Sequence, residues 1–283
     1  MQTYPAAGGG RWVVVEPERF AGWLTRFARR HGPVEATATP HAVSFRAADG
    51  ALAECRVPFP PLVGLDPAGG LDPAGGLDPA GGGDNPAAEP DPASGGDQEG
   101  GVGEAGRAAA RALVAHALAD RRVGVLLVRL GGHAAGVFAG SRLVTSKVGS
   151  RPVHGRSAAG GWSQHRFARR REGQVRTALA AAADMAARVL TPAAGTLDAI
   201  VTGGERRAVD SVLADRRLAP LRPLVVAAFL DVPDPRARIL SRIPDQFRAI
   251  RIHVSDPTAA PEPPAGWPVR DPNAIDAGES AGG

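Results

Sequence analysis

The sequence predicts an α+β protein, in which a mixed β-sheet packed by helices follows a small N-terminal α+β unit. Three observations lead to this prediction. Short strand-like runs surround one amphipathic helix in residues 11–57. Three more strand-like runs follow one another in residues 123–148, as in an antiparallel meander. Beyond them, helical and strand-like segments alternate up to residue 254, which favours a mixed sheet covered by helices.

The small N-terminal unit is expected over residues 1–62. Its helix begins at Pro17 and ends near Arg30, because Pro is well suited to a first helical position and apolar residues then recur at helical spacing. Alternating or dense apolar runs predict its strands near residues 12–16, 34–38, 42–46 and 51–57.

A second unit is expected over residues 105–255. Its predicted helices cover residues 107–120, 164–190 and 205–215. Its predicted strands cover residues 123–129, 134–139, 142–148, 199–202, 224–228 and 250–254.

Two acidic segments lie outside these units and are expected to be disordered. Residues 63–104 include a Gly-Leu-Asp-Pro-Ala-Gly repeat that starts at Gly64, Gly70 and Gly76, and Pro and Gly at this density oppose helix and strand interiors. We expect a linker there and an acidic tail over residues 256–283. At the end of the linker, residues 101–106 match the pattern of a dinucleotide-binding turn, but no strand precedes them in the sequence, so we expect no cofactor.

The remaining chain is strongly basic. Without residues 64–104 and 255–283 it holds 32 Lys and Arg side chains against 15 Asp and Glu. Such a surface attracts polyanions, because neutralised phosphates release counterions. A solvated arginine-rich surface is the alternative, but the clustering of the charge favours nucleic acid.

Composition also limits the compartment and the chemistry. The one cysteine, Cys55, can form no disulfide within the chain, and the histidines are scattered, so we expect no metal site. We see no signal peptide and no apolar run of about 18 residues, and therefore expect a cytoplasmic protein without membrane contact.

Basic residues concentrate between residues 147 and 176, where eight Lys or Arg stand against the single acid Glu172. A loop rich in Gly, Ser and Arg comes first, and the longest predicted helix follows. Helical geometry turns Val175 and Leu179 toward the sheet and Arg166 and Arg169 away from it. An ordinary solvated helix would not explain why the preceding loop is also basic.

The segment from Gly160 to Arg171 resembles the catalytic loop of eukaryotic and archaeal class I peptide-release factors. That loop reads Gly-Gly-Gln-Ser-Ala-Leu-Arg-Phe-Ala-Arg-Leu-Arg, and eight of its twelve positions carry the same residue type here. His154-Gly155-Arg156 also resembles the His-Gly-Arg that precedes it. The resemblance covers residues 105–254 and implies their central domain, which has an RNase H-like mixed sheet.

One departure changes the implied family. Trp162 stands where release factors have the glutamine of Gly-Gly-Gln, and the loop's glutamine, Gln164, comes two residues later. This pattern is similar to the Vms-like release-factor family, whose actinobacterial type carries Gly-Gly-x-Ser-Gln. The resemblance implies a peptidyl-tRNA hydrolase of ribosome rescue that does not decode stop codons.

The resemblance also implies the site residues and partners. The catalytic group would be Gln164, with Gly160, Gly161 and Ser163 beside it. RNA would be bound by Lys147, Arg151, His154, Arg156, Trp162, His165, Arg166, Arg169, Arg170 and Arg171. We expect a monomer that acts on the ribosome and on peptidyl-tRNA.

The residues also bear on three other functions and on one possible anion site. A non-catalytic RNA- or ribosome-binding factor stays open, because Trp162 replaces the usual glutamine. A serine hydrolase is disfavoured, since Ser163 and His165 are two apart on a helix and do not face each other. An RNase H-like nuclease is disfavoured, because the cluster of acidic residues that it would need is missing from the predicted strands. Asp198 is the only evident acid at the end of a strand. Thr202-Gly203-Gly204 could bind an anion at a helix N-terminus, but we favour a tight strand-to-helix turn.

Overall fold

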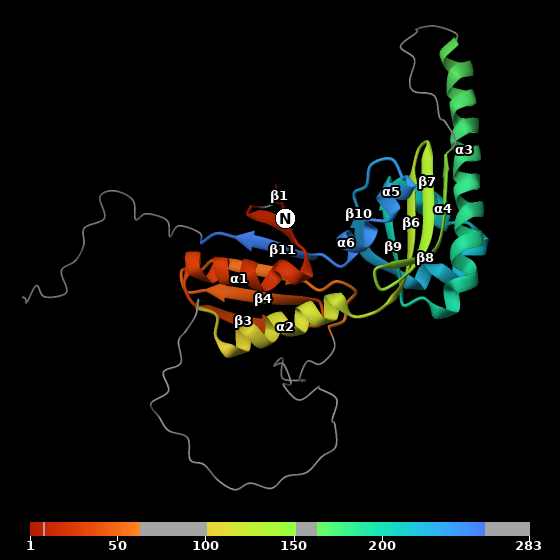
Figure 1. Ribbon diagram of the computed structural model, residues 1–283. Coiled ribbons are helices and arrows are strands. Elements are labelled where there is room, and N and C mark those ends of the chain that lie inside the picture. Colours follow the sequence, from red (N-terminus) through yellow and green to blue (C-terminus); the bar gives the residue numbers. More distant parts are fainter. Residues whose placement is uncertain (8, 63–100, 151–162, 258–283) are drawn as a thin grey trace, which may run out of the picture.

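Two β-sheets, each packed by helices, form the framework of the protein (Figure 1). The structure is a computed structural model that describes residues 1–7, 9–62, 101–150 and 163–257. In the helix that begins at Ser163, side chains are described from residue 169 onward. This architecture confirms the expected α+β class. Most of the expected linker and tail, residues 63–100 and 258–283, lies outside the described residues.

The first sheet is antiparallel throughout and has six strands. In spatial order they are β1 (Gln2–Pro5), β2 (Arg11–Val15), β11 (Ile250–Ser255), β5 (Leu52–Arg56), β4 (Ala42–Ala47) and β3 (Val34–Ala38). Buried residues alternate with more exposed ones along the central strands, so one face of the sheet forms the core and the other is open.

Helix α1 (Pro17–His31) covers the core face with the stripe that the sequence predicted. Phe20, Trp23, Leu24 and Phe27 are all buried, and their spacing places them on one side of the helix. The helix ends at Gly32, whose φ of 90° is a conformation that glycine adopts without steric cost.

Two elements that we expected in the second unit belong to the first instead. Strand β11 lies between β2 and β5, and Ile250, Ile252 and Val254 are buried in the first core. Helix α2 (Glu104–Leu118) packs beside α1, with Leu113 in that same core. Their apolar patterns predicted strand and helix correctly. The patterns do not encode which sheet an element joins, and adjacency in sequence was the wrong guide.

The second sheet is mixed, as expected, and has the order β10 (Val225–Leu230), β9 (Ala199–Gly204), β6 (Arg122–Arg129), β7 (Gly132–Ala139) and β8 (Arg142–Ser150). β6, β7 and β8 form the predicted antiparallel meander, whereas β9 and β10 run parallel to β6. Six consecutive residues of β6 are buried, because helices cover both faces of this sheet.

Helices surround the second sheet on two sides. One face packs against α3 (Ser163–Leu190), α4 (Arg206–Leu213) and the 3₁₀ turns η2 (Thr191–Thr196) and η3 (Arg216–Leu224). The other face packs against the short helices α5 (Ala237–Leu240) and α6 (Ile243–Phe247). These two helices were not predicted, because four and five residues are too few to show helical periodicity.

An aromatic contact joins the two units, and a buried histidine of the first unit holds the segment that makes this contact. The Phe247 ring lies 5.6 Å from that of Phe59 and 5.9 Å from that of Phe138, centroid to centroid. The Nε2 of His116 donates to the carbonyl oxygens of Pro58 and Phe59, at 3.0 and 3.1 Å. Burial lowers the pKa of His116, which favours the neutral ring at this junction.

Removal of β11 should unfold the first unit although the strand lies near the end of the chain. A chain shortened before Ile250 should lose the first sheet, whereas one shortened after Pro257 should keep the stability of the full chain. Ile252→Ala should cost about 2–5 kcal/mol of unfolding free energy, because the side chain is fully buried. Urea denaturation followed by circular dichroism measures all three. Equal stability of the two shortened chains would contradict the central position of β11.

Candidate nucleic-acid interface

Helix α3 is the longest element and spans 28 residues, which corresponds to roughly 42 Å. Its C-terminal half lies on the second sheet, chiefly against β7. Buried there are Ala178, Ala182, Ala186 and Leu190, and three of these four side chains are single methyl groups. Small side chains allow the helix axis to approach the sheet closely, which fixes the direction of the whole helix.

The N-terminal half of α3 is not part of this core. None of residues 169–177 is buried, and Figure 1 shows the helix continuing past the end of the second sheet. We call residues 163–177 the α3 arm. Val175 is the one apolar side chain of residues 169–177, so this stretch has too little apolar surface to be buried on the sheet.

The described part of the arm carries unneutralised positive charge. Arg169 and Arg170 are exposed and Arg171 is partly exposed, and none of the three forms an ion pair with a described residue. The Nε of Arg171 is buried without a hydrogen-bond partner among the described residues. Lys147 is exposed on edge strand β8. These four cations are therefore available to an anionic ligand.

The remaining predicted site residues are only partly described. Ser163, Gln164, His165 and Arg166 lie on the first turn of α3, where the backbone is helical. The loop residues lie outside the described ranges and are Arg151, His154, Arg156, Gly160, Gly161 and Trp162. The assignment of Gln164 as catalytic group therefore stays a prediction.

The side chains considered for other chemistries have structural roles. The Oδ2 of Asp198 accepts a hydrogen bond from the Arg122 backbone N–H at 2.6 Å, and so joins β6 to the start of β9. Cys55 is fully buried, and burial raises the pKa of its thiol well above the ordinary value, which opposes a reactive thiolate. Within the described ranges, no three His, Cys, Asp or Glu side chains gather as a metal site requires.

The two glycine-rich sequences also have packing roles. Gly204 has a φ of +104°, and a Cβ there would collide with the carbonyl oxygen of Val128, so this segment is a tight strand-to-helix turn. Val102, within the dinucleotide-like sequence, forms an isolated bridge with Val34 and is buried. Its carbonyl oxygen accepts a hydrogen bond from Arg107, at the start of α2.

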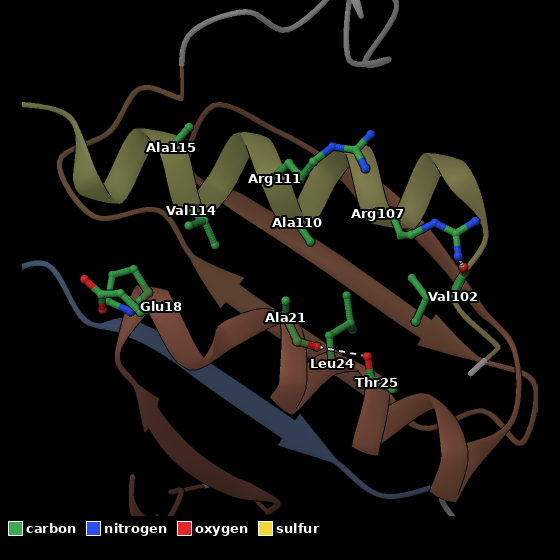
Figure 2. Close-up of a pocket in the computed structure, with 11 residues that line it drawn as sticks. Glu18, Ala21, Leu24, Thr25, Val102, Arg107, Ala110, Arg111, Val114 and Ala115 are labelled. Atoms are coloured by element: carbon green, nitrogen blue, oxygen red, sulfur yellow. Dashed lines mark hydrogen bonds between the residues drawn. The ribbon is translucent and has the colours of Figure 1, made fainter. Parts of the chain in front are cut away.

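One groove had no signal in the sequence, because its two walls are about 90 residues apart along the chain. Figure 2 shows it between α1 and α2, with Ala21 and Leu24 on one wall and Ala110 and Val114 on the other. Its volume is about 480 Å³. Arg107 and Arg111 also line it, but both pair with Glu104, so they are not free to bind a phosphate ligand.

Among the described helices, none is both long and apolar enough to cross a membrane.

A mixed sheet that carries a long helix with a basic, projecting end is the arrangement that the release-factor resemblance implied. Residues 121–253 match a family described as the VLRF1 release factor of Actinobacteria and Chloroflexi. The match confirms, for this part of the chain, the resemblance seen in the sequence. The match extends from β6 into β11 and leaves out α2 and the rest of the first sheet.

Solved structures with lower similarity were also found, whereas no curated protein matches the chain. The archaeal translation termination factor aRF1 is 17% identical over 45% of this chain, with a TM-score of 0.33. Archaeoglobus fulgidus Pelota is 11% identical over 88% of the chain and 67% of its own, with a TM-score of 0.25. Dom34 from S. cerevisiae is 8% identical over 86% of the chain and 66% of its own, with a TM-score of 0.23. This chain spans 36% of the length of aRF1.

Gly173→Ala should stiffen the α3 arm. A Cβ at Gly173 would meet nothing within 4 Å. Alanine favours an exposed helix over glycine by about 1 kcal/mol, so amide hydrogen exchange in the arm should slow about fivefold. Gly204→Ala is the control, and it should lower stability because its Cβ has no room. Unchanged exchange in the Gly173 variant would contradict a solvated, helical arm.

Proposed function

We propose that this protein hydrolyses the ester between nascent peptide and tRNA on stalled ribosomes, with a water molecule placed by Gln164. The supporting observations are the Gly160–Arg171 sequence, the release-factor family of residues 121–253 and the basic arm that follows the loop. The proposed partners are rRNA and peptidyl-tRNA in the cytoplasm, and the protein acts as a monomer.

The observation that carries the proposal is the position of Gln164 on the arm. Gln164 lies 14 residues before Ala178, the first buried residue among the described side chains of the helix, which corresponds to about 20 Å along the axis. A single helix is about 10–12 Å wide with its side chains. Such an arm can enter a narrow RNA-walled channel while the body of the protein stays outside.

The reaction suits an amide side chain. A peptidyl-tRNA ester is already activated, so its hydrolysis needs a positioned water and a stabilised oxyanion more than a protein nucleophile. The glutamine amide both donates and accepts hydrogen bonds, and can therefore orient water without changing charge. Gly160 and Gly161 carry no Cβ and allow close approach of the backbone to RNA. The arginines of the arm bind phosphates and set its depth.

A second function is favoured by one observation. Trp162 occupies the position of the release-factor glutamine, so the chain could keep the fold and bind ribosomes without catalysing release. Association of the wild-type protein with stalled ribosomes, without cleavage of the ester under single-turnover conditions, would favour this alternative.

Gln164→Ala should lower the rate of peptide release by about 100-fold or more, because loss of one positioned hydrogen-bonding group at such a site has effects of this size. The measurement is single-turnover release of labelled peptide from purified stalled ribosome–peptidyl-tRNA complexes. Gln2→Ala is the matched control, since Gln2 is exposed on β1 in the first sheet. Release at the full rate by the Gln164 variant would show that the assignment of Gln164 is wrong.

Neutralising the arm should weaken ribosome binding without changing the fold. In the variant Arg169→Gln with Arg170→Gln, we expect the salt dependence of log K to become shallower by about one unit for each lost phosphate contact. Sedimentation with stalled ribosomes at several salt concentrations measures this slope. Arg188→Gln with Arg207→Gln is the control, because both residues are exposed but lie away from the arm. Equal slopes for the two variants would refute a role of the arm in phosphate binding.

A further inference from the structure

A basic hollow lies where the open face of the first sheet meets the second unit. Its volume is about 710 Å³. Arginines reach it from three different elements: Arg56 from β5, Arg251 from β11 and Arg206 from the start of α4. We call it the junction groove. It shares no residue with the α3 arm.

Two of these arginines stand directly opposite each other. Arg56 and Arg251 are paired in register on neighbouring antiparallel strands, so their side chains leave the same face of the sheet. Like charges in this arrangement destabilise a sheet. Neither forms an ion pair with a described residue. Folding alone gives no reason to place two unpaired cations side by side, whereas a polyanionic ligand does.

Aromatic rings hold two of the guanidinium groups in place. Arg56 lies over the Trp12 ring at 4.6 Å from its centroid, and Arg206 lies over the Phe229 ring at 4.2 Å. Cation–π contacts orient a guanidinium group but leave its charge unneutralised and its N–H groups free to donate. The groove is therefore arranged in advance for a multiply charged anionic acceptor.

We propose that the junction groove binds the phosphate backbone of RNA, as a second RNA-binding surface beside the α3 arm. Charge complementarity identifies the ligand class: three arginines and His41 line the groove, and Glu54 is the one carboxylate among its lining residues. Since guanidinium groups already cover Trp12 and Phe229, the groove suits backbone phosphates better than stacked bases. The proposal does not depend on the hydrolase reaction.

The test is binding of the full chain to fluorescein-labelled deacylated tRNA, measured by anisotropy at several salt concentrations. The triple variant Arg56→Gln, Arg206→Gln and Arg251→Gln should bind about tenfold more weakly or worse, with a salt slope shallower by about 2 to 3. The matched control is Arg26→Gln, Arg29→Gln and Arg30→Gln on α1, which removes the same charge from the helix-covered side of the first sheet. This control should bind tRNA like the wild type.

Two results would overturn the proposal. One is equal affinity and equal salt slope for the junction variant and the α1 variant, both folded by circular dichroism. The other concerns a synthetic peptide of residues 64–83. If the wild-type protein binds this peptide and the junction variant does not, while both bind tRNA equally, the groove would belong to the chain's own acidic segment. The Gln164→Ala variant should bind tRNA normally here, so loss of release and loss of junction binding can be told apart.

Discussion

Packing of the alanine-rich face of α3 on strand β7 is the contact on which the functional geometry depends. Ala178, Ala182 and Ala186 bring the helix close to the sheet over its C-terminal half, and Leu190 ends that contact in the core. The sheet beneath is rigid, because helices cover both of its faces. Because the C-terminal half of α3 is fixed on the sheet, the direction in which its N-terminal half projects is fixed as well. The arm needs no core of its own, and polar and basic residues can occupy it.

The same body carries basic surfaces of two different kinds. The α3 arm is a single projecting helix on which Arg169, Arg170 and Arg176 are exposed. The junction groove is concave and is assembled from strand and helix residues far apart in the sequence. Phe247 joins the two units beside that groove through its contact with Phe59, and His116 holds the Pro58–Phe59 segment in place. Rigid attachment at the junction would therefore set the distance between two points of contact with RNA.

Sequence patterns predicted the elements better than their partners. Pro17 and the Phe20–Phe27 stripe predicted α1, and the glycine turns predicted the β6–β7–β8 meander, because both signals are local. The sheet that β11 joins depends on contacts across nearly 200 residues, and apolar periodicity carries no such information. For the same reason, the pairing of Arg56 with Arg251 could not be predicted from the sequence. The arm was predicted from its charge pattern, whereas the glycine loop that completes the proposed site lies outside the described residues.

The place of β11 has a consequence for how the protein is made. One of the two neighbours of β2 in the sheet, strand β11, is synthesised some 240 residues later than β2 itself. Until residue 255 has emerged from the exit tunnel, β2 and β5 each present an unpaired edge flanked by apolar side chains, which is a surface prone to association with other strands. Nascent chains of this protein therefore expose two association-prone strand edges while the whole of the second sheet is being synthesised.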